Sequence, residues 1–302
     1  MFRVREQVGC RQSMLNAGGC GVTVAVLDTG VAAHPDLNGR ILDFKDFTEG
    51  REAAYDDSGH GTHVCGIACG SGALSRGKYC GMAPKADLVV GKVLDGRGDG
   101  TVNAMLAGIS WVLQERDRLG IRILNVSVGV SGQMDADREK VLKEMLESAW
   151  QKGLAVVCAA GNNGPAENSL SEIGKSHYLI TVGCHDGAYY EGKTSRCAAY
   201  SARGSLFDTV RKPDIVAPGT EIISCNGGVR RTRGGYQNAY IAKSGTSMAT
   251  PVVSGALALL FQQHPEYDNE TAKRKLLYAA DDLREPWVSQ GWGMINVERL
   301  LE

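Results

Sequence analysis

The strongest constraint on the fold is an alternation along the chain between short apolar runs and longer segments with helical periodicity. Five apolar runs are predicted to be buried strands: 22–27, 88–93, 121–128, 154–158 and 178–182. Four segments have apolar residues at helical spacing: 60–69, 102–118, 135–152 and 247–263. Continuous apolar runs are typical of parallel strands, because such strands are covered on both faces. The alternation therefore predicts an α/β fold with a doubly wound, mostly parallel sheet flanked by helices on both faces.

Nothing in the composition divides this predicted sheet into separate domains. The 302 residues are 43% hydrophobic and 22% charged, which is typical of a globular protein. No linker, low-complexity tract or internal repeat interrupts the chain, so we expect a single domain over residues 1–302. Residues 1–18 are expected to be an extension docked on the surface, with obstruction of the functional site as the alternative. Residues 227–240, which carry three arginines, are expected to form a long mobile loop.

Charge and cysteine content exclude several classes of protein. A net charge of −1 lacks the basic excess of proteins that bind nucleic acids or membrane surfaces. The longest apolar stretches, such as 252–261, are shorter than the roughly 20 residues needed to cross a bilayer. The N-terminal residues contain no apolar signal region, and the nine cysteines are scattered. We therefore expect a cytoplasmic protein in a reducing compartment, with a secreted protein as the alternative if a leader was removed before this numbering begins.

Three polar residues stand at the ends of predicted elements, where sites form in open parallel sheets. Asp28 follows the first predicted strand, and His60 opens a helix between two glycines. Ser247 begins another helix, whose exposed amides and positive end face its surroundings. Taken singly, these residues are typical of a turn aspartate, a structural histidine and a helix cap. Together, in the order Asp, His, Ser, they supply an orienting acid, a base and a nucleophile.

The segments around these three residues match the motifs of a known family. They are Val-Leu-Asp-Thr-Gly at 26–30, His-Gly-Thr-His-Val at 60–64 and Gly-Thr-Ser-Met-Ala-Thr-Pro at 245–251. In these motifs the chain resembles the subtilisin-like serine proteases, and the likeness extends over about residues 20–280. The stretch 212–219 and the lack of a leader are most similar to the intracellular, AprX-type branch.

The resemblance implies the subtilisin-like fold and a serine endopeptidase of broad specificity. It assigns Ser247 as the nucleophile, His60 as the general base and Asp28 as the residue that orients His60. It also assigns the side-chain amide of Asn162 and the backbone N–H of Ser247 as donors to the oxyanion. His63, one helical turn after His60, is expected to be a helix residue rather than a second base.

The resemblance further implies that an extended substrate binds by strand addition between two backbone segments, 127–129 and the loop near 98–100. A pocket beyond Asn162 would select the residue before the scissile bond. Glu172 would either favour a basic residue there or point to solvent. The substrate-binding residues expected on this basis are Ser127, Val128, Gly129, Gly98, Gly100, Ala160, Gly161, Asn163, Ser171 and Glu172.

No cofactor is expected for the chemistry. A zinc site would have to use His60, His63, Cys65 and Cys69, but no second ligand pair accompanies them, so buried free thiols are the alternative. Structural calcium is implied by the resemblance, because related enzymes often carry it. The candidate ligands of such a cation are the carbonyl groups of residues 174–179, together with Asp186.

Two other functions stay open. A pseudoprotease would bind peptides in the same cleft without cleaving them, although Ser247, His60 and Asn162 are all present. A peptide ligase or macrocyclase would resolve the same acyl-enzyme with an amine instead of water. Protein or peptide substrates are the expected partners, and the oligomeric state is not predicted. With 27 residues before Asp28, no propeptide is expected within this chain.

Overall fold

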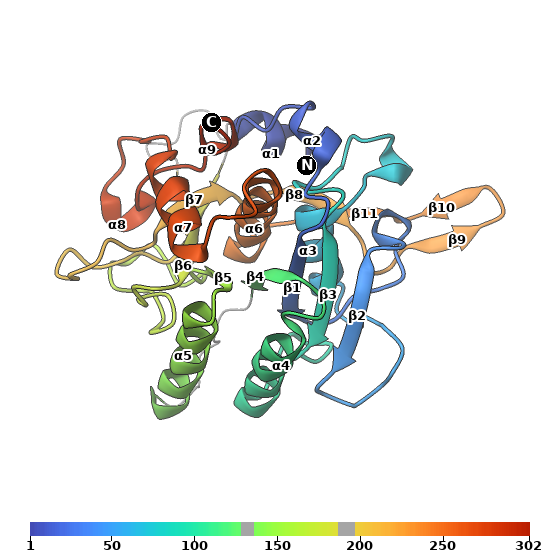
Figure 1. Ribbon diagram of the computed structural model, residues 1–302, viewed down its shortest axis with the longest axis horizontal. Helices are drawn as coiled ribbons and strands as arrows, with labels where there is room; N and C mark the ends of the chain where they lie inside the picture. The colour runs from blue at the N-terminus through green and yellow to red at the C-terminus, as the bar shows by residue number, and fades with distance from the viewer. Residues whose placement is uncertain (128–135, 187–196) are drawn as a thin grey trace.

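Seven strands form the central sheet of the computed structural model, which describes residues 1–127, 136–186 and 197–302 (Figure 1). Their order is β2-β3-β1-β4-β5-β6-β7, and every neighbouring pair is parallel. The strands are β1 (Thr23–Asp28), β2 (Ile41–Asp46), β3 (Asp87–Lys92), β4 (Ile121–Val126), β5 (Ala155–Ala159), β6 (Ile180–His185) and β7 (Ile215–Pro218). The prediction of a parallel, helix-flanked α/β sheet is confirmed.

Four long helices pack on this sheet. The helices α3 (His60–Cys69) and α6 (Thr246–Gln263) pack against each other, and α6 also contacts β1 and β4 to β7. The helices α4 (Val102–Glu115) and α5 (Ala136–Gln151) form the second pair, side by side at the lower edge of Figure 1. Helix α6 is buried from Thr246 to Phe261, as expected for a helix with apolar residues on nearly every side.

The remaining helices complete the described structure. They are α1 (Phe2–Gln7), α2 (Met14–Ala17), α7 (Asn269–Tyr278), α8 (Trp287–Gln290) and α9 (Val297–Leu300), with 3₁₀ turns η1 (Pro35–Leu37) and η2 (Ala73–Ser75). Among the residues described, no helix is both long enough and apolar enough to span a bilayer.

The parallel register brings the ends of three strands to one edge of the sheet. Leu27 of β1 pairs with Val126 of β4, and Val126 pairs with Cys158 of β5. The residues that directly follow these strands therefore lie near one another. This edge is where the sequence predicts a functional site.

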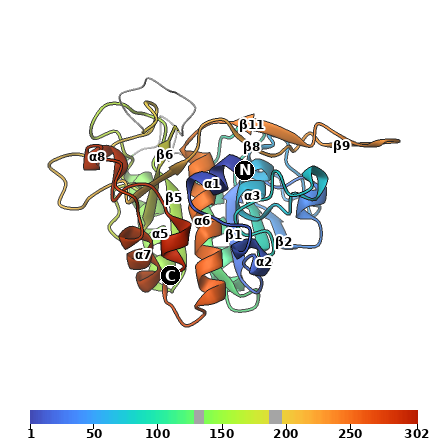
Figure 2. The ribbon, with the colours of Figure 1, turned by 90° about the horizontal axis from the view of Figure 1, so that it is seen from above.

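The prediction of a long mobile loop at residues 227–240 is wrong. This segment contains β9 (Arg230–Thr232) and β10 (Gly235–Gln237), which pair only with each other as an antiparallel hairpin. The hairpin extends from a second antiparallel pair, β8 (Ile222–Cys225) and β11 (Tyr240–Lys243). Figures 1 and 2 both show it reaching beyond the rest of the molecule.

The N-terminal segment is docked on the body of the protein. Val4, Val8 and Leu15 are buried in the main hydrophobic core. Arg5 donates to the carbonyl groups of Cys80 and Gly77, and the carbonyl of Val8 accepts a hydrogen bond from the N–H of Val297 at 2.7 Å. Residues 1–18 thus contact the 77–80 turn and the C-terminal helix α9, in keeping with a docked extension.

Candidate active site

Asp28 and His60 form a hydrogen-bonded pair at the carboxyl edge of the sheet. Asp28 is the last residue of β1 and is completely buried, whereas His60 is the first residue of α3. His60 Nδ1 lies 2.7 Å from Asp28 Oδ1, which also accepts the N–H of Thr29 at 2.7 Å. Because the carboxylate can only accept, Nδ1 carries the proton and Nε2 keeps its lone pair. The imidazole is thus oriented as a base.

The surroundings of His60 adjust its basicity in opposite directions. Burial disfavours the imidazolium and lowers its pKa, whereas the charge of Asp28 and the hydrogen bond to it raise the pKa. The pKa of His60 is raised overall above its usual value of 6.5. Lys243, the last residue of β11, lies near enough for its charge to lower the same pKa.

The start of α3 is held in place by Asp56. Its carboxylate accepts hydrogen bonds from the N–H groups of Ser58, Gly59 and Thr62, and from the hydroxyl groups of Thr29 and Thr62. These five bonds tie the end of β1 to the first turn of α3. Sequence reasoning missed this residue, although an acidic residue shortly before a helix start is a recognised capping signal.

His63 does not act beside His60. Its Nε2 lies 2.9 Å from the carbonyl oxygen of Ile222 and 3.1 Å from that of Ile241, so Nε2 carries the proton. Burial lowers the pKa of His63 to about 3, and the side chain stays neutral. His63 therefore joins α3 to β8 and β11, as expected for a structural helix residue.

Ser247 lies in the first turn of α6, where backbone N–H groups have no partner within the helix. The side chain is 9% exposed. Gly245 has a φ of +151°, and a Cβ there would lie 3.4 Å from Asn162 Nδ2, so glycine leaves the space beside Ser247 open. Ser247 and His60 are not hydrogen-bonded to each other in this structure. Hydrogen bonds between catalytic groups often form or shorten only when substrate binds.

The side chain of Asn162 is oriented by the residue before Ser247. Asn162 Oδ1 accepts the N–H of Thr246 at 3.0 Å and its hydroxyl at 3.1 Å. Thr246 Oγ1 in turn accepts the N–H of Gly161 at 3.2 Å. Since both partners of Oδ1 are donors, the amide Nδ2 is the atom left to face the space beside Gly245. No sequence pattern indicates this role for Thr246.

Comparisons with known proteins agree with this geometry. The family model described as "Subtilase family" matches residues 19–294. The chain belongs to the subtilase family. It is 38% identical to serine protease AprX of Bacillus subtilis (strain 168) over 93% of this chain and 66% of AprX. It is 34% identical to Subtilisin Savinase of Lederbergia lenta over 93% of this chain and 90% of Savinase.

A solved structure supports the fold assignment of this subtilase. Sphericase superposes with a TM-score of 0.80 at 30% identity, covering 93% of this chain and 92% of that protein. The resemblance to subtilisin-like proteases and to the AprX branch is therefore confirmed. The subtilase chain spans just under two thirds of AprX, the remainder of which has no counterpart in the match.

The residues expected to bind an extended substrate fall into three groups. Val128 and Gly129 lie outside the described residues. Ser127 is buried at the end of β4, and its hydroxyl accepts from Asn125 Nδ2 at 2.8 Å. Gly98 and Gly100 lie in an exposed turn in which the N–H of Gly98 donates to Asp95 at 3.1 Å. Of the two segments expected to align a substrate, the structure therefore describes Ser127 and the turn at 98–100.

The residues expected near the specificity pocket differ in exposure. Ala160 is buried against Leu170 and Ala202, while the carbonyl of Gly161 accepts from the N–H of Ala202 at 2.9 Å. Asn163 is exposed, and Ser171 Oγ accepts from the N–H of Gly174 at 3.2 Å. Ala160, Leu170 and Ala202 form a small apolar cluster, to which Gly161 is joined by its hydrogen bond to Ala202.

Glu172 takes the solvent-facing alternative. Its side chain is 51% exposed and pairs with Lys175 at 3.0 Å. A charge held at the surface by a neighbouring ammonium is screened by water and is a weak source of selectivity. The expectation that Glu172 favours basic residues in the pocket therefore has no support from this geometry.

Three of the carbonyl groups at 174–179 that were candidates for a structural cation accept hydrogen bonds from a lysine. Lys273 Nζ donates to the carbonyl oxygens of His177, Tyr178 and Leu179 at 2.7, 2.9 and 3.0 Å. Its charge is balanced by Asp214 Oδ1 at 3.2 Å. The ammonium therefore already supplies the positive charge that a metal ion would bring to these three oxygens. Residues 177–179 consequently do not fit the calcium site considered from the sequence.

The zinc arrangement is also not formed. His60 and His63 are engaged with Asp28 and with backbone carbonyls, and all nine cysteines are free. Cys65 and Cys69 are completely buried, and burial raises the pKa of both thiols, that of Cys69 to about 12. Buried free thiols, the alternative considered from the sequence, describe these residues.

One cluster in the described part of the chain brings potential metal ligands together: His34, Asp36 and Cys225. Both ring nitrogens of His34 are already used, with Nε2 2.7 Å from the carbonyl oxygen of Ala239 and Nδ1 accepting the N–H of Asp36. The Asp36 carboxylate accepts from Tyr240 and from the N–H of Leu74. These bonds explain the cluster as structural.

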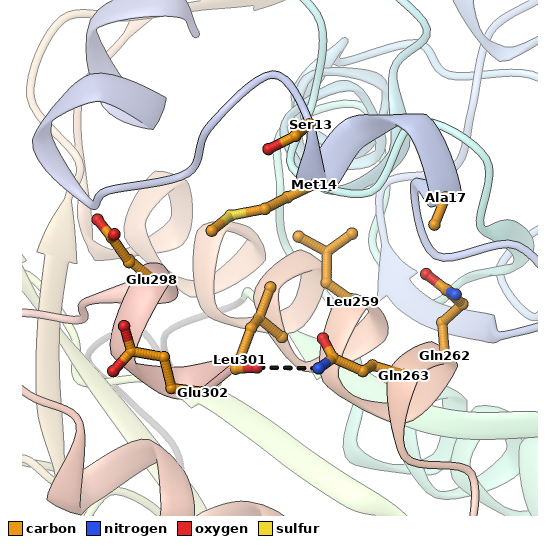
Figure 3. Close-up of a pocket in the computed structure, with 9 residues that line it drawn as sticks. All are labelled: Ser13, Met14, Ala17, Leu259, Gln262, Gln263, Glu298, Leu301 and Glu302. Atoms are coloured by element: carbon orange, nitrogen blue, oxygen red, sulfur yellow. Dashed lines mark hydrogen bonds between the residues drawn. The ribbon is translucent and has the colours of Figure 1, made fainter.

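A hollow of about 470 Å³ lies at the far end of α6 from Ser247 (Figure 3). Gln263 Nε2 donates to the carbonyl of Leu301 at 2.9 Å across its floor. At about 1.5 Å per helical residue, Leu259 is roughly 18 Å along the axis from Ser247. The hollow is thus separate from the candidate active site. Its lining residues are Ser13, Met14, Ala17, Leu259, Gln262, Gln263, Glu298, Leu301 and Glu302.

Proposed function

We propose that this subtilase is a serine endopeptidase that cleaves peptide bonds through Ser247, His60 and Asp28. The observation that carries the proposal is the 2.7 Å contact between His60 Nδ1 and Asp28 Oδ1. This contact leaves Nε2 as the basic nitrogen and provides a buried negative charge to stabilise the imidazolium. The family membership and the named serine proteases among its relatives support the same reaction.

In the proposed reaction, His60 Nε2 takes the proton of Ser247 as Oγ attacks the carbonyl carbon of the scissile bond. The tetrahedral oxyanion accepts hydrogen bonds from Asn162 Nδ2 and from the N–H of Ser247. His60 then donates the proton to the leaving amine as the C–N bond breaks, and an ester on Ser247 remains. Water, deprotonated by His60, hydrolyses the ester and regenerates the hydroxyl.

We propose that the substrate is an extended protein or peptide segment bound mainly through its backbone. The backbone of Ser127 and the exposed turn at Gly98 and Gly100 would supply peptide groups on which a substrate strand can align. Backbone recognition is largely independent of side chains, so a broad specificity follows. No described charged residue of the pocket favours one class of side chain.

Labelling with a fluorophosphonate probe, followed by mass analysis of peptide products, tests this function. A folded wild-type protein is expected to take the label on Ser247 and to release two products whose summed mass exceeds that of the parent peptide by one water. Products joined to an added amine without gain of water would indicate a ligase. Absence of label on the folded protein would indicate a pseudoprotease.

A further inference from the structure

The β9–β10 hairpin is a sparsely packed part of the described structure. All six strand residues are exposed, and the two strands pair with no other strand. An isolated two-stranded hairpin is only marginally stable in water, so packing does not explain its presence. Both ribbon views show it standing clear of the body (Figures 1 and 2).

The hairpin concentrates positive charge in a chain whose net charge is −1. Residues 222–243 contain Arg230, Arg231, Arg233 and Lys243, and no aspartate or glutamate. The three arginines are exposed, and none forms an ion pair with another residue in the described ranges. Arg231 pairs with Tyr236, and Arg230 pairs with Gln237. Because adjacent residues of a strand point to opposite faces, the two arginines lie on opposite faces of the hairpin. We name residues 229–238 the basic arm.

The base of the basic arm adjoins the candidate active site. Gly227 packs on Gly59, the residue before His60, and a Cβ on Gly227 would lie 2.8 Å from the Gly59 Cα. On the other side, β11 ends at Lys243, four residues before Ser247, and the charge of Lys243 reaches His60. The arm is thus anchored to the same elements that position the proposed nucleophile and base.

The base is also firmly held. The N–H of Asn226 donates to the carbonyl of Ala239 at 2.9 Å, and the Tyr240 hydroxyl donates to the buried Asp36 at 2.6 Å. His63, inside α3, lies within hydrogen-bonding distance of carbonyl groups of both β8 and β11. A polypeptide bound to the arm would therefore be held at a defined position relative to the cleft.

We propose that the basic arm is a secondary binding site for acidic segments of protein substrates. Guanidinium groups bind carboxylates in a two-pronged geometry, and the free edges of β9 and β10 offer backbone groups to an extended chain. Three unpaired arginines raise the local concentration of acidic polypeptides beside the cleft. This inference rests on the proposed peptidase function for its effect on cleavage, but not for binding itself.

Two quenched peptides with the same cleavable core, one with a polyglutamate tail and one with a polyglutamine tail, test the arm. At low ionic strength, wild type is expected to cleave the glutamate peptide about tenfold better in kcat/KM, through KM. The ratio should fall to about one in the variant Arg230→Gln/Arg231→Gln/Arg233→Gln. A matched variant, Arg138→Gln/Lys140→Gln/Lys152→Gln, removes the same charge from the distant α5 region and should keep the ratio.

Binding is measured separately in the Ser247→Ala background by fluorescence anisotropy of the labelled glutamate tail. Loss of affinity in the arm variant and not in the α5 variant supports the proposal even if neither peptide is cleaved, in which case only the peptidase function fails. Equal affinity for the two tails, or a preference that survives the arm variant, would overturn it. Tight binding of a single-stranded oligonucleotide without preference for the glutamate tail would overturn it in favour of a nucleic-acid site.

Discussion

Asn162 Oδ1 accepts both the N–H and the hydroxyl of Thr246, the residue directly before the proposed nucleophile. The donor amide of Asn162 and the backbone of Ser247 are therefore fixed relative to each other before any substrate arrives. A donor held in advance stabilises a transition state more than one that must be ordered during the reaction.

Replacing Asn162 tests its proposed role as an oxyanion donor. Asn162→Ala is expected to reduce kcat about 100- to 1000-fold with little change in KM, because the lost hydrogen bond forms mainly in the transition state. Steady-state kinetics on a peptide substrate measures both constants, with Asn16→Ala on the surface helix α2 as control. A rise in KM at constant kcat would assign Asn162 to substrate binding instead.

Thr246→Val tests whether Asn162 must be oriented. The change keeps the side-chain shape and the backbone N–H bond but removes the hydroxyl that links Gly161 to Asn162. We expect kcat to fall about tenfold, less than for Asn162→Ala, because one of two orienting bonds remains. In the double variant the two losses should not add, since they act on one interaction. Full additivity would show that Thr246 acts independently of Asn162.

The raised pKa of His60 predicts a specific pH dependence. The base must be neutral to act, so kcat/KM should fall as the pH drops through an apparent pKa above 6.5. Asp28→Asn removes the charge that raises this pKa, so the acidic limb should move to lower pH while kcat falls about 10⁴-fold. For stability the sign is opposite: the ion pair with imidazolium stabilises the fold below pH 6.5 and is lost as the pH rises through the raised pKa. An unmoved acidic limb would contradict the assignment.

The Lys273 ammonium binds the carbonyl groups of residues 177–179, where a metal ion would otherwise bind. We therefore predict that these residues need no metal. Lys273→Met is expected to lower the stability by about 3 kcal/mol, because the carbonyl groups of His177 and Tyr178 lose their ammonium donor, while Leu179 and Asp214 keep only Lys212 as an ammonium partner. The matched change Lys275→Met, on the exposed side of α7, should have little effect. Thermal unfolding measures the stability of both variants. A wild-type Tm that rises with calcium and falls with EDTA, to the same extent in Lys273→Met, would contradict the prediction.

Glu172→Gln should leave the specificity profile as it is. The carboxylate faces solvent and pairs with Lys175, so its charge is screened from the pocket. Cleavage-site profiling on a peptide library, with Phe and Arg compared before the scissile bond, should give the same ratio within about twofold. A loss of cleavage after Arg would show that Glu172 turns inward when substrate binds.

Sequence patterns predicted the buried parts of this fold better than its edges. Helix α3 was predicted with its observed bounds, 60–69, because glycines and an apolar helix face delimit it. Strand β2 was missed because it is an edge strand, with Leu42 and Lys45 exposed, and its pattern is not a continuous apolar run. The sequence of the hairpin predicts a loop, because its strands bury nothing and therefore have no apolar pattern.

The candidate site divides in the same way. Asp28, His60, Ser247 and Asn162 were found from motifs, since each stands where an element begins or ends. The partners that orient them, Thr246 and Asp56, act through hydrogen bonds between segments distant in the sequence, which no local pattern reveals. Lys273 is a similar case, since its three carbonyl partners lie about 95 positions away.

Substitution of the proposed nucleophile tests the mechanism most directly. Purified Ser247→Ala and wild type are compared for the initial rate of casein cleavage, with unfolding curves to show that both are folded. The rate of the variant should fall about a million-fold, because removing the nucleophile abolishes the acyl-enzyme route. Cleavage by folded Ser247→Ala at the wild-type rate would contradict the assignment of Ser247 and, with it, the proposed triad.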